Sequence, residues 1–291
     1  MKKATRLLSG AQKEFHDLFK GLCDSHNSWE VWGDFVRMSA IAISNACDQS
    51  GEIHDQREAR YMETMKRYSA REQEVFPKMF SIIVNTLEIN PDQDFLGELF
   101  MTLELSNQWK GQFFTPYNLC KCMAEMQIGE SEEAIKKKSY IAINDPACGA
   151  GALLIAARNT LGLRKIDWST QALFVAQDID EIAGLMCYIQ LSLLGCAGYV
   201  CVADSLLYPI TGTSPLLPLI KPEQDFWFTP VWFTDTWAIR RFLATLPEAP
   251  AREAEETPII TDTHKKTVTE ATETAFDFKL TENECGQYSL F

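Results

Sequence analysis

The sequence predicts an α/β protein in which a helical N-terminal region precedes a mostly parallel sheet. From Tyr140 onward, short apolar runs alternate with longer segments of helical spacing. Alternation of this kind favours parallel strands joined by right-handed helical crossovers. Before Tyr140 apolar residues recur only at helical spacing. We expect a helical domain at 1–106, an α/β domain at 107–247 and an acidic, disordered tail at 248–291.

The composition excludes several classes of protein. No apolar run approaches the roughly 20 residues that cross a bilayer, so we expect a cytoplasmic protein without membrane contacts. The net charge of −13 argues against a nucleic-acid footprint over the whole chain, although a local basic surface stays possible. The nine cysteines lie mostly in apolar patterns, which indicates reduced thiols. The four histidines are far apart, so we expect no metal site.

The helical region carries aromatic residues at core spacing. Residues 11–48 read as two amphipathic helices that break near Ser25–Ser28, and 55–87 continues in the same way. A further helix starts at Pro91 and runs towards Asn107. We predict that this region packs on, or covers, the sheet that follows.

A glycine turn joins the first predicted strand to its helix. The strand Tyr140–Ile143 leads into Asn144–Gly151, and the helix Ala152–Arg158 follows. Gly149 and Gly151 permit positive φ angles and a close approach of the backbone to a ligand, and the helix start offers unpaired N–H groups. Such a turn suits a nucleotide-like cofactor. The Gly-x-Gly spacing alone is a weak signal, because glycine turns also occur for geometric reasons.

Acidic residues follow the next two strands. Asp178 ends the strand that begins at Ala172, and Asp204 ends the strand that begins at Tyr199. Ligands of parallel sheets bind at the carboxyl ends of the strands, where Gly149, Asp178 and Asp204 are all expected. One acid at a strand end is often a helix cap, whereas two acids beside a glycine turn favour a binding site.

Four segments resemble the N6-adenine DNA methyltransferases in order and spacing, and most closely the modification subunits of type I restriction-modification systems. They are Gln112–Pro116, Asp145–Gly151, Gln177–Asp180 and Ala203–Leu206. In that family such segments bind S-adenosylmethionine. The resemblance implies a doubly wound, Rossmann-like methyltransferase sheet, DNA as the substrate, and a specificity or other subunit as a partner.

The resemblance also assigns roles to individual residues. Asp178 would hold the ribose, Ile179 would lie against the adenine, and Asp204 would accept from the adenine amine. The residues around the methionine part would be Phe113, Thr115 and Pro116 at its border and Asp145, Ala147, Gly149 and Gly151 below it.

The catalytic motif of the family is missing. Its members use Asn/Asp/Ser-Pro-Pro-aromatic after the fourth strand, and this sequence contains no Pro-Pro pair. The nearest match is Thr229-Pro230-Val231-Trp232, which predicts a hydroxyl from Thr229, a carbonyl from Pro230 and a stacking face from Trp232 for a flipped base. The sheet is also expected to stop at its fourth strand.

The C-terminal tip resembles the short Gln-x-Ser/Asp-Leu-Phe peptide by which bacterial proteins dock on the DNA polymerase sliding clamp. Gln287 would anchor the polar end, and Leu290 and Phe291 would fill an apolar pocket. The alternative is a tip that packs back on its own domain.

Three hypotheses about function follow. The first is a DNA adenine-N6 methyltransferase with a degenerate catalytic motif. The second is a catalytically inactive, DNA-associated or regulatory protein that keeps the cofactor site and is tethered to the replication clamp. The third is a methyltransferase for another amine or a small molecule, which the family resemblance disfavours.

Overall fold

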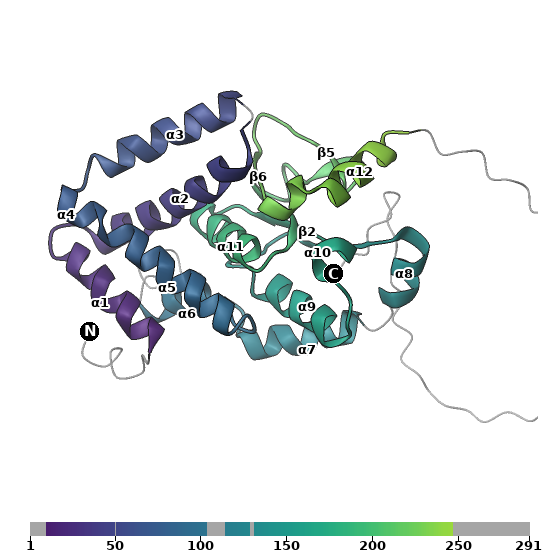
Figure 1. Cartoon of the computed structure of the whole chain (residues 1–291), viewed down its shortest axis with the longest axis horizontal. Helices are drawn as coiled ribbons and strands as arrows, with labels where there is room; N and C mark the ends of the chain where they lie inside the picture. The colour runs from purple at the N-terminus through teal and green to yellow at the C-terminus, as the bar shows by residue number, and fades with distance from the viewer. Residues whose placement is uncertain (1–9, 50, 104–113, 129–130, 247–291) are drawn as a thin grey trace, which may run out of the picture.

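The first part of the chain folds into helices, as its apolar spacing predicts. The computed structural model describes residues 10–49, 51–103, 114–128 and 131–246. The helices of the N-terminal region gather on one side of the molecule (Figure 1). They are α1 (Ala11–Cys23), α2 (Ser28–Cys47), α3 (Gly51–Met65), α4 (Ala70–Gln73), α5 (Val75–Ile89) and α6 (Phe95–Thr102).

Local capping and aromatic packing explain where these helices end and how they meet. The predicted break near Ser25–Ser28 is confirmed, and Asn27 caps α2 by accepting from the amide of Trp29 at 2.9 Å. The predicted helix over 55–87 is divided, because Ser69 and Glu72 form a capping box that starts α4. Edge-to-face contacts of Phe15 and Phe19 with Trp32 join α1 to α2.

The second part alternates between strands and helices. In order, its elements are α7 (Tyr117–Gln127), α8 (Ser131–Lys138), β1 (Ile141–Asp145), α9 (Ala152–Leu163), α10 (Trp168–Gln171), β2 (Ala172–Asp178), α11 (Glu181–Leu193), β3 (Ala197–Val202), β4 (Thr211–Ser214), β5 (Leu217–Leu219), β6 (Asp225–Phe228), the 3-10 helix η4 (Pro230–Phe233) and α12 (Asp235–Ala244). The charged stretch 131–139 mostly forms α8.

The described residues form a mixed, mostly parallel four-stranded sheet in the order β1-β2-β3-β6. The three predicted parallel strands are confirmed, and the last residue of β2, Asp178, lies level with Val202 in β3. β6 differs from its neighbours, because it runs antiparallel beside β3, with Phe228 opposite Tyr199 and Asp225 opposite Val202. The small β4–β5 hairpin was not predicted.

The helical region and the α/β region share one buried core. One continuous cluster of buried side chains includes Phe15 and Trp32 of the helical region, Leu154 of α9 and Trp227 of β6. α11 lies between the sheet and α2 and packs on both (Figure 1). A second cluster covers another part of the sheet and includes Tyr199, Trp232 and Trp237.

Two negative findings concern the described residues only. Among them, no helix has both the length and the apolar character that a membrane crossing requires. Within the same ranges, no group of three or more histidine, cysteine, aspartate or glutamate side chains is arranged to hold a metal ion. The tail at 248–291, with Gln287, Leu290 and Phe291, lies outside the described residues.

Candidate cofactor-binding site

The glycine turn after β1 can be built only from glycine at two positions. Gly149 has φ 54° and Gly151 has φ 93°, in the left-handed region that favours residues without a Cβ. A Cβ on Gly149 would lie 2.9 Å from the ring of Phe114, and one on Gly151 would lie 2.8 Å from the Sγ of Cys187. The turn is therefore packed tightly from both sides and leads directly into α9.

The carboxylate of Asp178 holds this turn at the end of β2. Its Oδ2 accepts from the amide of Gly149 at 2.8 Å, and its Oδ1 accepts from the amide of Asp180 at 2.9 Å. The amide of Cys148 also donates to the carbonyl of Gln177 at 3.0 Å. The glycine turn and Asp178 thus lie together, as the positions of the strand ends predict.

Burial controls the electrostatics of the turn. It raises the pKa of Asp178 above the ordinary aspartate value, although its two backbone donors act in the opposite direction. Burial also raises the pKa of Asp145, and the nearby charge of Asp178 adds to this effect. Asp145 accepts from the amide of Ala147 at 3.2 Å, and Ala147 is exposed at the tip of the turn.

Asp204 lies at the same edge and caps its own loop. The amide of Ala203 donates to the carbonyl of Asp178 at 3.0 Å, which places the end of β3 beside the end of β2. The Oδ1 of Asp204 accepts from the amides of Leu206 at 2.8 Å and Leu207 at 3.3 Å. The capping role that single acids often have is therefore present here.

Large apolar side chains are exposed around these acids. Ile179 is 70% exposed, Leu206 is 90% exposed and Leu207 is 71% exposed. These side chains follow the ends of β2 and β3, so apolar surface is exposed at the carboxyl edge of the sheet.

The segment upstream of α7 reaches the glycine turn through one aromatic ring. The ring of Phe114 lies over Gly149 and also packs on Phe100 with a centroid distance of 5.2 Å. Thr115 and Pro116 are exposed at the start of α7, and Phe113 lies outside the described residues. The sequence shows two adjacent aromatic residues, and their spacing alone does not decide which one contacts the turn.

A buried amide that the sequence analysis did not select supports the turn from behind. The Nε2 of Gln190 in α11 donates to the carbonyl of Ala150 at 2.9 Å and to the Oδ1 of Asp94 at 2.8 Å. Its Oε1 accepts from the amide of Leu96 at 3.1 Å. Gln190 is the polar residue in an apolar stretch of α11, and this was the available signal. It connects the turn to the start of α6.

The predicted catalytic segment, Thr229 to Trp232, lies at the opposite end of the sheet from the glycine turn. Thr229 is fully buried, and its hydroxyl donates to the carbonyl of Cys196 at 2.7 Å and accepts from the amide of Gly198 at 3.0 Å. These partners lie at the amino end of β3. The cofactor edge is at the carboxyl end, four residues further along, or roughly 13 Å at strand spacing.

Pro230 and Trp232 follow Thr229 away from the cofactor edge. The indole of Trp232 is buried, stacks on Phe228 at 5.1 Å and meets Tyr199 edge-to-face at 5.4 Å. Its ring therefore belongs to the core and offers no face to a flipped base. The direction of β6 is the physical reason: an antiparallel strand carries the segment after it to the amino ends of the parallel strands.

Comparison with known proteins gives one match. The model of the N-6 DNA methylase family matches residues 94–241, which is half of the chain. No curated protein and no solved structure gives a significant match. The matched range contains the glycine turn, Asp178, Asp204 and all four strands of the sheet. The chain therefore belongs to the N-6 DNA methylase family.

Proposed function

We propose that this protein binds S-adenosylmethionine at the carboxyl ends of β1, β2 and β3 and acts in N6-adenine methylation of DNA. The observation that carries the proposal is the hydrogen bond between Asp178 and the amide of Gly149, which joins an acid to a glycine turn at a strand-end edge. Family membership supplies the reaction.

The residues present fit this cofactor. Asp178 is placed to accept from the ribose hydroxyls, Ile179 and Leu206 offer apolar surface to the adenine, and Asp204 offers a carboxylate to its amine. In this proposal the turn at Gly149 and Gly151 lies below the methionine part, with Asp145 and Ala147 beside it and Thr115 and Pro116 at the border. When bound, the cofactor supplies an electrophilic methyl group.

We assign no residue of this chain to accept a hydrogen bond from the target amine. The sequence has no Pro-Pro pair, and the hydroxyl of Thr229 is bonded inside the sheet. This favours a second candidate function, in which the chain binds the cofactor as a catalytically inactive, DNA-associated or regulatory subunit. We further propose that the sheet is a shortened form of the Rossmann-like methyltransferase sheet, and that an active complex needs residues from another chain, such as a specificity subunit.

Calorimetry and a transfer assay separate these functions. The protein is titrated with S-adenosylmethionine and then incubated with the labelled cofactor and unmethylated DNA, alone and with host extract. Saturable binding with label in N6-methyladenine supports the enzyme. Binding without transfer supports the subunit function, and absence of binding overturns both.

The tip at Gln287, Leu290 and Phe291 carries a separate proposal, namely docking on a bacterial sliding clamp in the cytoplasm. It is supported only by the peptide resemblance. A peptide of residues 284–291 is titrated against purified clamp, and a peptide with Leu290→Ala and Phe291→Ala is the control. Equal binding of the two peptides, or none, overturns the proposal.

A further inference from the structure

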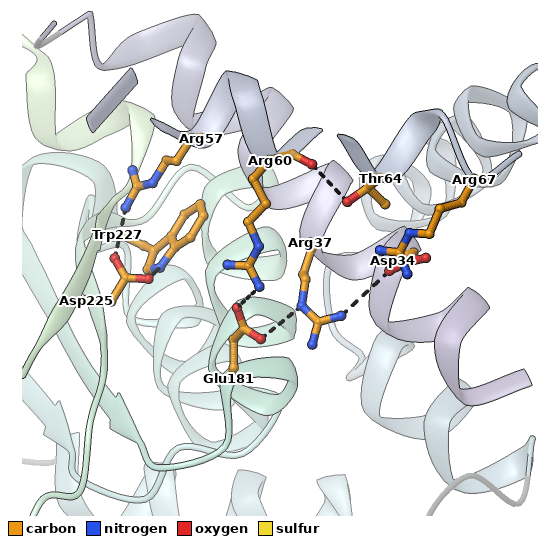
Figure 2. A network of polar contacts seen from close by, with 9 residues as sticks. All are labelled: Asp34, Arg37, Arg57, Arg60, Thr64, Arg67, Glu181, Asp225 and Trp227. Atoms are coloured by element: carbon orange, nitrogen blue, oxygen red, sulfur yellow. Dashed lines mark hydrogen bonds and ion pairs between the residues drawn. The ribbon is translucent and has the colours of Figure 1, made fainter. Parts of the chain in front are cut away.

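Two arginines of the helical region grip the first residue of α11 from different helices. The Nε of Arg37 in α2 donates to the Oε2 of Glu181 at 2.9 Å, and the Nη2 of Arg60 in α3 donates to its Oε1 at 2.7 Å. Both carboxylate oxygens are therefore held, one by each helix (Figure 2). Charge-assisted hydrogen bonds of this kind are shorter and stronger than neutral ones.

Glu181 is connected to the cofactor edge through its immediate neighbours. It follows Asp180, which caps α11 by accepting from the amide of Ala183 at 2.9 Å. The amide of Asp180 in turn donates to Asp178, and Asp178 accepts from Gly149. A displacement at the start of α11 is thus transmitted through two hydrogen bonds to the proposed ribose acid.

The helical region is built to reach this point closely. A Cβ on Gly33 of α2 would lie 2.9 Å from the Nη1 of Arg37 and 3.6 Å from the side chain of Ile182, so the glycine leaves space for both. Arg37 also lies 3.7 Å from the buried carboxylate of Asp34. Arg67 pairs with the same carboxylate at 2.9 Å but does not contact Glu181 in Figure 2.

We propose that Arg37 and Arg60 are positioning residues for the cofactor site. They fix Glu181 and so hold the loop Asp178–Asp180 in the geometry that receives the ribose and adenine. The inference rests on the proposed binding of S-adenosylmethionine. The helical region would then influence cofactor binding without contacting the cofactor itself.

A purely electrostatic effect of these arginines on cofactor affinity would have the opposite sign to a positioning effect, so an affinity measurement distinguishes the two. Arg37, Arg60 and Arg67 line one solvent-open depression of about 410 Å³ together with Glu63 and Thr64. S-adenosylmethionine carries a net positive charge at neutral pH, so removal of an arginine charge strengthens its binding if only the long-range field acts. Loss of positioning weakens it instead.

The experiment compares Arg60→Met with Arg67→Met by calorimetry with S-adenosylmethionine. We expect roughly three- to tenfold weaker binding for Arg60→Met and an unchanged or slightly stronger affinity for Arg67→Met. In the background of Glu181→Gln, the effect of Arg60→Met should shrink, because the partner has lost its charge and one of its two acceptor oxygens. Equal weakening by both arginine variants, or additive effects of Arg60→Met and Glu181→Gln, overturns the proposal.

Amide hydrogen exchange keeps the test independent of cofactor binding. Arg60→Met should speed exchange in a peptide covering Ile179–Ala183 while exchange in β3 stays unchanged, since only the start of α11 is released. If the wild-type protein binds no S-adenosylmethionine, the proposed function fails. The exchange result still decides whether Arg60 stabilises the start of α11. Unchanged exchange at Ile179–Ala183 overturns it.

Discussion

The backbone amide of Gly149 donates to the carboxylate of Asp178 across 2.8 Å, so the turn after the first strand is held by the acid that ends the second. The other oxygen of Asp178 accepts from Asp180, which fixes the carboxylate from two directions. A ribose that binds Asp178, as proposed, would therefore meet a carboxylate that is already oriented. Orientation before binding lowers the entropic cost of binding.

Replacing Asp178 tests the binding site directly. Asp178→Asn should weaken the binding of S-adenosylmethionine about 10- to 100-fold, because a hydrogen bond to a charged acceptor is worth about 1.5–3 kcal/mol. Calorimetry gives the affinity, and thermal unfolding shows whether the fold is kept. Asp167→Asn is the matched control, since Asp167 also fixes a turn, through bonds to Ser169 and Thr170, at the start of α10. Unchanged affinity in Asp178→Asn would show that the site is misassigned.

As the pH falls, cofactor binding should be lost at a higher pH than an aspartate with an ordinary pKa would give. Burial raises the pKa of Asp178, so its carboxylate gains a proton at a higher pH than an exposed one. Affinity is present above this raised pKa and is lost as the pH falls through it. Calorimetry over a pH series measures the acid limb, and Asp178→Asn should remove it. A limb that persists in the variant would place the titrating group elsewhere.

Thr229 should affect stability and leave cofactor affinity unchanged. Thr229→Val keeps the shape but leaves the carbonyl of Cys196 and the amide of Gly198 without the hydroxyl, at a cost of about 1–3 kcal/mol. Thr229→Ser keeps the hydroxyl and should cost less. Chemical denaturation measures both variants, and calorimetry measures their affinity. Loss of affinity at full stability would return Thr229 to the active site.

Two glycines have positive φ angles, 153° at Gly198 and 70° at Gly195, but only Gly198 also lacks space for a Cβ. Gly198→Ala places a Cβ 1.8 Å from the carbonyl oxygen of Phe174, a backbone atom that cannot move without breaking the pairing of β2 and β3. We expect a loss of about 3 kcal/mol or more. Gly195→Ala has φ 70° but no atom within 4 Å, so only the left-handed strain of about 1–2 kcal/mol applies. Equal losses in denaturation experiments would contradict this account.

The sequence predicted those features that local patterns determine. The break before α2 follows from the cap at Asn27, the parallel strands follow from their alternation with helices, and the glycine turn follows from Gly149 and Gly151. Asp178 falls beside the turn because carboxyl ends of parallel strands share an edge.

The features that were not predicted from the sequence depend on contacts between distant segments. The apolar run at Phe226–Phe228 indicates a strand but carries no direction, so the antiparallel pairing with β3 was not foreseen. That direction places Thr229 at the amino ends of the parallel strands, opposite the glycine turn. Likewise Arg60 reads as one charge on an exposed helix until the fold places it on Glu181, 121 residues away.

The continuous buried cluster that joins Phe15 and Trp32 to Leu154 and Trp227 has a consequence for how the protein is dissected. The family match begins at residue 94, yet α11 buries one side against α2, which precedes that residue. An expression fragment cut to 94–241 would expose the side of α11 that packs on α2, where Ile182 lies next to Gly33, and would lose both arginines that hold Glu181. We therefore expect the matched segment to need the preceding helices for stable folding, because the buried core continues past its first residue.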